Sequence, residues 1–184
     1  MKKVLGIISM ALVLVLLTGC GQNKTQPTVV DKPAKGNCKV FDCIKKLDTK
    51  NTLEDVNKVM GFEGEKEREG SGYTTYKWVI NEDKNEAVEA TFYSTSTTVS
   101  ITFSDDDIKN PKVDFSKFDE IKKAMNNRET VTYDDVKAKF NAEGTLIEKS
   151  SFSTKYRWVN EKGGYINANF NNSTKACTMI MGRI

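Results

Sequence analysis

The chain has 184 residues, of which 38% are hydrophobic and 29% are charged, a balance typical of a soluble globular protein and unlike a polytopic membrane protein or a disordered chain. It contains no histidine, which excludes Ser-His-Asp and Cys-His catalysis and histidine-ligated metal sites. The formal net charge is +3, but Lys2 and Lys3 lie in a predicted export signal, and the remaining 26 basic and 25 acidic side chains leave +1. So small a charge indicates no nucleic-acid partner.

Residues 1–19 are predicted to be a lipoprotein signal peptide. Two lysines precede an apolar run over residues 4–17, which is too short to span a bilayer comfortably. The next residues, Leu17-Thr18-Gly19-Cys20, resemble the bacterial lipobox, in which the cysteine receives a diacylglyceryl group before cleavage on its N-terminal side. We expect Cys20 to be lipidated and to anchor the chain to the cell membrane on its extracytoplasmic side. An ordinary signal peptide with a chance cysteine is the alternative.

Residues 20–37 are predicted to be the lipidated cysteine followed by a flexible tether. The segment after Cys20 is polar, lacks periodicity and carries two of the three prolines. Such a composition buries too little apolar area to offset the entropy of ordering. A short strand through Thr28-Val29-Val30 is the alternative.

Sliding the chain against itself by 80 residues reveals an internal repeat. The matched positions are Thr52, Asp55, Glu63-Gly64 and Tyr76-Lys77-Trp78-Val79 in the first copy, and Thr132, Asp135, Glu143-Gly144 and Tyr156-Arg157-Trp158-Val159 in the second. We therefore predict repeat unit 1 over residues 38–104, and a connection with repeat unit 2 over residues 105–184. The polar run at 105–107 in that connection lacks the ligand spacing of a calcium loop and is expected to be solvated.

Each unit is predicted to contain two helices and about four antiparallel strands. Thr52 and Thr132 are expected to cap the second helices, because each stands three residues before an aspartate. The expected strands of the first unit cover residues 65–69, 73–80, 87–93 and 97–103. The predicted fold is α+β, with two tandem helix-helix-antiparallel-sheet repeats whose sheets lie side by side with all helices on one face.

Strand alternation predicts which side chains face the helices. Trp78 and Trp158 are expected to be core residues. The residues left on the open face are Thr75, Lys77, Val79, Glu89, Thr91 and Tyr93 in the first unit, and Lys155, Arg157, Val159, Asn167, Asn169 and Asn171 in the second. This open face is predicted to be largely polar.

The F-D-x-I start of the first helices (41–44 and 118–121), the threonine-capped second helices and the A-T-F at 90–92 resemble the beta-lactamase inhibitory protein family and its lipoprotein relatives over about residues 38–184. The resemblance implies a sheet face that embraces an enzyme and a loop that inserts an acidic side chain into its active-site cleft. The matching loop is residues 81–86, where Glu82 or Asp83 would be that acid. The corresponding loop of the second unit is residues 160–165, which ends with Tyr165. The family's half-cystine pairs have no counterparts at the matching positions.

Three further cysteines follow Cys20. Cys38 and Cys43 are close enough in sequence to form a disulfide, although a continuous helix through both would point them apart. Cys177 takes the place of inward-facing Val99 in the repeat, so we expect a small buried hydrophobe. We expect no metal and no cofactor, and no motif in the sequence predicts an enzyme.

The sequence thus predicts a membrane-anchored, non-catalytic module that binds a protein partner in the cell envelope. The expected contacts are Lys77 and Arg157 on the open face, and Glu82, Asp83 and Tyr165 in the loops. One alternative is an inhibitor of a beta-lactamase or penicillin-binding enzyme that acts through residues 81–86. The other is an envelope-assembly scaffold, because small outer-membrane-assembly lipoproteins share a related shape and fold similarity does not assign a partner.

Overall fold

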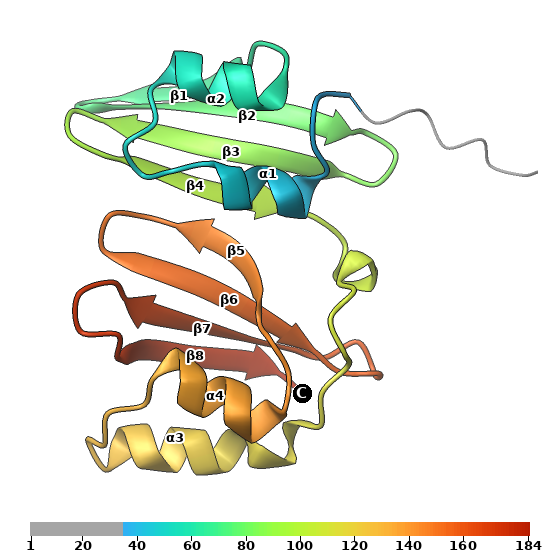
Figure 1. Cartoon of the computed structure of the whole chain (residues 1–184), viewed down its shortest axis with the longest axis vertical. Coiled ribbons are helices and arrows are strands. Elements are labelled where there is room, and N and C mark those ends of the chain that lie inside the picture. The colour runs from blue at the N-terminus through green and yellow to red at the C-terminus, as the bar shows by residue number, and fades with distance from the viewer. Residues whose placement is uncertain (1–34) are drawn as a thin grey trace, which may run out of the picture. The chain divides into compact units, whose positions relative to one another are not determined.

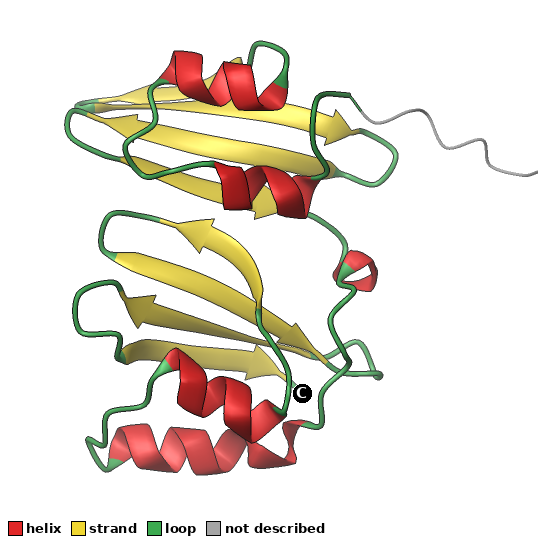
Figure 2. Ribbon diagram, viewed as in Figure 1, coloured by secondary structure: helices red, strands yellow, loops and turns green. Residues whose placement is uncertain are grey.

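The computed structural model describes residues 35–184, which belong to one compact unit, Asp31–Ile184. The predicted signal peptide (1–19), the lipidation at Cys20 and most of the predicted tether lie outside the described residues. The fold is α+β, with four α-helices and one antiparallel sheet of eight strands (Figure 1, Figure 2). None of the helices in residues 35–184 has the length and apolar character needed to cross a membrane.

The elements follow one another as two helices, four strands, two helices and four strands. The helices are α1 (Val40–Lys46), α2 (Leu53–Met60), α3 (Phe118–Asn126) and α4 (Tyr133–Phe140). The strands are β1 (Glu65–Gly70), β2 (Tyr73–Asn81), β3 (Glu86–Tyr93), β4 (Thr97–Thr102), β5 (Thr145–Lys149), β6 (Ser153–Val159), β7 (Tyr165–Asn171) and β8 (Cys177–Arg183). Two 3-10 turns, η1 (Asp105–Asp107) and η2 (Phe115–Lys117), lie in the connection. The strands expected in residues 65–103 are confirmed within one residue at each end.

Helices α2 and α4 both begin with a capping box. In α2 the Thr52 hydroxyl accepts a hydrogen bond from the Asp55 backbone N–H (3.2 Å), and the Asp55 carboxylate accepts one from the Thr52 N–H (2.9 Å). Thr132 and Asp135 form the same reciprocal pair at α4. The bonds from the threonines hold the pKa values of both aspartates below their usual range. The predicted N-caps are confirmed, and each stabilises its helix by about 1 kcal/mol.

The eight strands form one sheet in sequence order, β1 to β8, rather than two separate sheets. The joint between the two halves of the sheet, where β4 meets β5, is narrow. These two strands pair only through Val99 with Lys149 and Ser100 with Glu148. The Lys149 ammonium reinforces it by donating to the backbone oxygen of Leu47 (2.9 Å) just past the end of α1. Burial lowers the pKa of Lys149, while the carbonyl ends of a helix favour the charged form.

All four α-helices cover the same face of the sheet. Residues paired across antiparallel strands share a face, and an unbroken series of pairs joins the two halves: Ala90, Val99, Lys149, Thr154 and Phe170. Ala90 belongs to the apolar cluster under α1 and α2, and Phe170 to the cluster under α3 and α4. The opposite face, called the open face below, carries no α-helix of the described residues (Figure 1).

A tryptophan anchors each apolar cluster, as the sequence predicts. Trp78 and Trp158 are 0% and 2% exposed. The indole of Trp78 donates to the Phe62 carbonyl at 3.2 Å and that of Trp158 to the Ala142 carbonyl at 2.9 Å. Each indole also leaves no room for a side chain beneath it, since a Cβ on Gly144 would lie 2.6 Å from the Trp158 ring. A Cβ on Gly64 would likewise collide with the Trp78 ring.

The two outer strands of the sheet differ in character. Strand β1 has the sequence EKEREG, and its charged side chains are exposed, as is usual where a sheet edge is protected from pairing with other chains. Strand β8 has the sequence CTMIMGR, with Met179 and Met181 49% and 52% exposed. The C-terminal edge therefore has a single charged side chain, that of Arg183, where the N-terminal edge has five.

The cysteines occupy two environments. Cys38 and Cys43 form a disulfide with a Cα–Cα distance of 5.4 Å, which is geometrically allowed because α1 begins only at Val40, after Cys38. Cys177 carries a free thiol that is half-buried beside the second apolar cluster. It is less buried than the repeat predicted, because β8 is an edge strand, yet burial still raises its pKa to about 11. The thiol is consequently uncharged at neutral pH.

Candidate binding surfaces

The first half of the open face is polar and its charges are paired. Lys77 lies 3.7 Å from Glu67 and faces Glu89 across the β2–β3 pair, while Arg68 lies 3.2 Å from Glu89. Burial and the neighbouring Glu67 raise the pKa of Glu89. Lys77 is thus a member of a surface charge network, and part of its charge is already compensated within the chain.

Arg157, which the sequence predicts to contact a partner, is held in place by contacts within its own chain. Its guanidinium donates to Asp105 at 2.7 Å and to Asn167 at 2.8 Å. It also lies 4.6 Å from the centre of the Tyr165 ring and 5.2 Å from that of Phe103. These contacts fix the connection after β4 to the open face of β6. The expectation that residues 105–107 are simply solvated is wrong for Asp105, whose carboxylate is an ion-pair partner.

The open face becomes apolar toward β8. Met181 pairs with Asn167 and Met179 with Asn169, so both methionines share a face with Arg157. Beside them, the Tyr165 ring has the Arg183 guanidinium 5.7 Å from its centre, in addition to that of Arg157. Sequence reasoning missed the methionines because the alternation was not extended into residues 177–183. We call Tyr165, Met179, Met181 and Arg183 the methionine patch.

Two of the residues that strand alternation places on the open face are buried. Thr75 is 1% exposed and its hydroxyl is hydrogen-bonded to that of Thr91 at 3.0 Å. Val159 is 2% exposed, and its carbonyl accepts a hydrogen bond from Val113 of the connection at 2.9 Å. Neighbouring side chains and the connection cover them. Period-2 alternation predicts which face of the sheet a side chain lies on, but not whether other groups cover it.

The predicted insertion loop, residues 81–86, is a compact turn between β2 and β3. The Asn81 side chain accepts a hydrogen bond from the Lys84 N–H at 3.1 Å, and the Asn85 N–H donates to the Glu82 carbonyl at 3.1 Å. Asn85 has a left-handed backbone, with φ of 52°. Glu82 and Asp83 are exposed at the apex. The turn therefore presents both acids, as a plug requires, but on a short and internally bonded segment.

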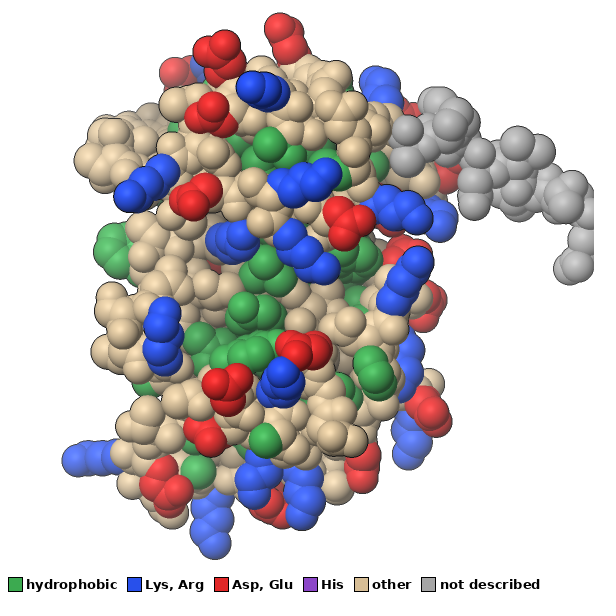
Figure 3. All heavy atoms as spheres, in the orientation of Figure 1, with side chains coloured by type: hydrophobic (Ala, Val, Ile, Leu, Met, Phe, Trp, Pro, Cys, Tyr) green, Lys and Arg blue, Asp and Glu red, His purple; other side chains and the backbone are tan. Residues whose placement is uncertain are grey.

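A hollow of about 640 Å³ lies on the helix-covered face, where the two halves of the sheet meet. Figure 3 shows apolar side chains (green) exposed in the hollow, with basic (blue) and acidic (red) side chains around it. Its residues come from α1, the connection, α4, β5 and β6: Lys39, Phe41, Asp42, Lys45, Ile108, Lys109, Asn110, Tyr133, Glu143, Gly144, Thr145, Leu146 and Tyr156. We call it the α1–α4 groove.

One wall of the groove is rigidly bonded. The Tyr133 hydroxyl donates to Glu143 at 2.6 Å and accepts from the Gly144 N–H at 3.2 Å, while its ring centre lies 4.4 Å from that of Tyr156. Asn110 ties the connection to this wall by donating to the Glu143 carbonyl at 2.9 Å and to the Thr145 hydroxyl at 3.0 Å. Burial and the bond to Glu143 raise the pKa of Tyr133, and the bonds from Lys137 and Tyr133 lower the pKa of Glu143.

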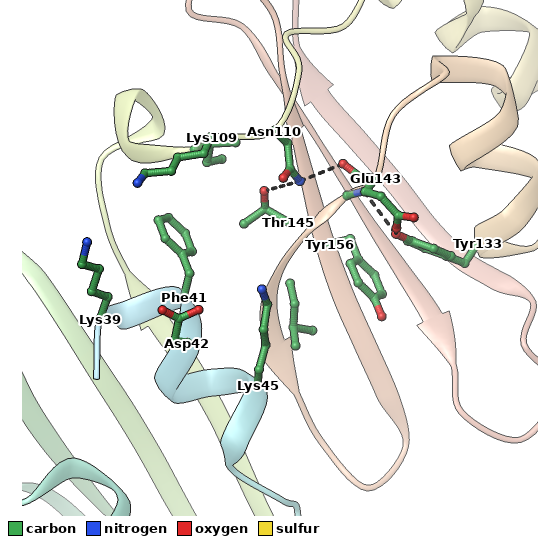
Figure 4. A pocket seen from close by; sticks show the side chains of 13 residues that line it. Lys39, Phe41, Asp42, Lys45, Lys109, Asn110, Tyr133, Glu143, Thr145 and Tyr156 are labelled. Atoms are coloured by element: carbon green, nitrogen blue, oxygen red, sulfur yellow. Dashed lines mark hydrogen bonds between the residues drawn. The ribbon is translucent and has the colours of Figure 1, made fainter. Parts of the chain in front are cut away.

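The other wall is formed by α1 and carries charge. Figure 4 shows the Lys39 and Lys109 amino groups on one side of the Phe41 ring, and that of Lys45 on the other. Sequence reasoning did not find this groove, because its residues are spread over more than a hundred positions and no local motif joins them.

Comparison with known proteins finds no matching family model, no similar protein of curated function and no similar solved structure. In residues 35–184, no group of three or more Cys, Asp or Glu side chains is placed to hold a metal ion.

Proposed function

We propose that this chain is an extracytoplasmic lipoprotein, anchored through Cys20, that acts as a non-catalytic module for binding a protein partner in the cell envelope. The lipobox-like Leu17-Thr18-Gly19-Cys20 supports the anchor. The Cys38–Cys43 disulfide supports the compartment, because structural disulfides persist outside the reducing cytoplasm. The single observation that carries the binding role is the methionine patch on a face with no helix over it.

The composition of the methionine patch fits protein recognition. Methionine adapts its shape to a partner at little cost and is common at binding surfaces, and tyrosine and arginine are frequent among the residues that dominate binding energy. Neither methionine is needed for the core, since both are about half exposed. The charge network around Lys77 would lie at the polar margin of such an interface.

We also propose that the fold arose as two tandem copies of one helix-helix-sheet unit. The support is that local contacts recur at a constant spacing of 80 residues. Thr52 and Thr132 form the same capping box, and the indoles of Trp78 and Trp158 donate to carbonyls at Phe62 and Ala142, each 16 residues earlier. Such a repeat is consistent with the resemblance to the beta-lactamase inhibitory protein family.

The binding role predicts that changing Met179 and Met181 to aspartate abolishes capture of the partner. The double variant places two charges in the apolar part of the proposed interface, where an unpaired charge is costly. Chemical cross-linking of the lipidated protein in envelope membranes, followed by mass spectrometry, identifies the partner of the unaltered chain. Phe152→Asp is the matched control, because Phe152 is 79% exposed but lies in the β5–β6 turn, away from the patch. Equal cross-linking by the double variant and the control would refute the role of the patch.

The exposed acids at the apex of the β2–β3 turn favour inhibition of a beta-lactamase or penicillin-binding enzyme as a second candidate function. If it is correct, residues 21–184 inhibit such an enzyme in a chromogenic assay, and Glu82→Ala with Asp83→Ala raises the inhibition constant at least about tenfold, the cost of one lost charged contact. Glu161→Ala in the β6–β7 turn is the control. No inhibition across a panel of these enzymes would leave the binding module, or an envelope-assembly scaffold, as the function.

A further inference from the structure

The α1–α4 groove has the size and lining of a small-molecule site. Its volume of about 640 Å³ lies in the range of such sites, which are mostly apolar with a few polar groups at defined places. Phe41, Leu146 and Tyr156 supply partly exposed apolar surface. The Tyr156 hydroxyl makes no hydrogen bond to another described residue, so a polar donor remains available in the lining.

The charge that lines the groove is positive, and its lysines form no ion pairs within residues 35–184. Lys39, Lys45 and Lys109 all line it, and within residues 35–184 none of the three has a carboxylate within 4 Å. Of the two acids in the lining, Glu143 is already paired with Lys137 and bonded to Tyr133. Within the lining only Asp42 remains to balance three ammonium groups, and Glu86 outside it interacts with Lys39 alone of the three, so the groove is complementary to an anion.

The floor of the groove argues against an extended peptide as the occupant. Strand β5 pairs with β6 along most of its length, and with β4 only at Glu148 and Lys149, so the edge left for an added peptide strand is limited to Thr145, Leu146 and Ile147. Backbone groups beside it are also engaged, since the Gly144 N–H bonds to Tyr133 and the Glu143 carbonyl to Asn110. Recognition is left to side chains: apolar surface in the middle and ammonium groups at the rim (Figure 4).

We propose that the α1–α4 groove binds a small amphipathic anion, with an apolar body against Phe41, Leu146 and Tyr156 and a carboxylate or phosphate head among Lys39, Lys45 and Lys109. This function goes beyond protein binding, because the groove lies on the helix-covered face of the sheet and the methionine patch lies on the open one. The two sites can therefore be occupied and tested separately.

Dodecyl phosphate, kept below the concentration at which it forms micelles, is the probe. Isothermal titration uses the chain without residues 1–20, which leaves the unit Asp31–Ile184 intact. We expect one molecule to bind with a dissociation constant below about 1 mM, as its 17 non-hydrogen atoms allow. Inorganic phosphate, which lacks the apolar body, and dodecyltrimethylammonium, which has the opposite charge, should each bind at least about tenfold more weakly.

The decisive variant is Lys45→Gln with Lys109→Gln, which removes two ammonium groups from the groove without touching a side-chain contact of the fold. Its control is Lys46→Gln with Lys162→Gln, which makes the same change in net charge at two exposed lysines outside the groove. We expect the groove variant to bind dodecyl phosphate at least about tenfold more weakly and the control to stay within about twofold of the unaltered chain.

Four results would overturn the proposal. These are no binding of dodecyl phosphate at millimolar concentration, equal binding of the cationic amphiphile, equal affinities of the groove variant and its control, or equal binding of inorganic phosphate. Loss of binding in the Met179→Asp, Met181→Asp variant but not in the groove variant would likewise assign the site to the open face. Because that variant tests the protein-binding role separately, the failure of one proposal is distinguishable from the failure of the other.

Discussion

Replacing Trp158 with alanine is expected to lower the free energy of unfolding by about 3–5 kcal/mol, the usual cost of removing a large buried aromatic side chain. The side chain is 2% exposed and packs against Tyr133, Phe140 and Tyr156, with ring centres 5.7–6.3 Å away. Its loss leaves a cavity at the centre of the second apolar cluster. It also removes the donor to the Ala142 carbonyl. Urea unfolding followed by circular dichroism measures the effect.

A conservative variant separates the two contributions of the indole. Trp158→Phe keeps an aromatic ring but loses the hydrogen bond to Ala142, so its expected cost is smaller, about 1–3 kcal/mol. Phe152→Ala, at a ring that is 79% exposed, should change stability by less than about 0.5 kcal/mol. If Trp158→Ala cost no more than Phe152→Ala, the second cluster would not depend on this residue.

Arg157→Ala is expected to cost about 2–3 kcal/mol, which is large for a residue on a sheet face. Its side chain is 21% exposed, and it loses a charge-assisted bond to Asp105, a bond to Asn167 and stacking on two aromatic rings. The change also leaves Asp105 beside Asp106 and Asp107 with no counter-charge from β6. Arg68→Ala is the matched control, because Arg68 is 61% exposed and pairs only with Glu89, so its expected cost is below about 1 kcal/mol.

A structural role for Arg157 has a local signature that a partner contact lacks. The Val113 N–H donates to the Val159 carbonyl and lies in the connection that Arg157 fastens. Hydrogen exchange at Val113 should therefore accelerate in Arg157→Ala and remain unchanged in Arg68→Ala. If the two variants lost equal stability and hydrogen exchange at Val113 did not change, Arg157 would not have this structural role, and a partner contact would remain as its predicted role.

The parts of the fold that could be predicted from the sequence are those that depend on residues close together in the chain. The caps at Thr52 and Thr132 follow from a threonine and an aspartate three residues apart, and the strands of the first half follow from period-2 alternation. The internal repeat then placed Trp158 in the core once Trp78 was placed there. Such features depend on neighbours within a few positions of the chain, so they can be read without coordinates.

The candidate sites could not be predicted in the same way. Arg157 and Asp105 are 52 residues apart, and residues 105–107 carry no pattern that points to β6. The α1–α4 groove forms where α1, the connection and β5 come together in space. The alternation of side chains within a single strand does not predict which distant segments meet. Met179 and Met181 are different, because their alternation in β8 is a local pattern that the sequence itself carries.

The narrow β4–β5 joint has a consequence for cooperativity. The sheet is continuous in its hydrogen bonds, yet few contacts join its two halves: the pairs of Val99 with Lys149 and Ser100 with Glu148, the Lys149 bonds to the end of α1, and Leu146 packed against the first apolar cluster. Each half therefore holds most of its stabilising contacts within itself, as neighbouring modules of a repeat protein do. Unfolding of one half is therefore expected to be only weakly coupled to unfolding of the other, so that a single melting temperature for the whole chain would average two transitions.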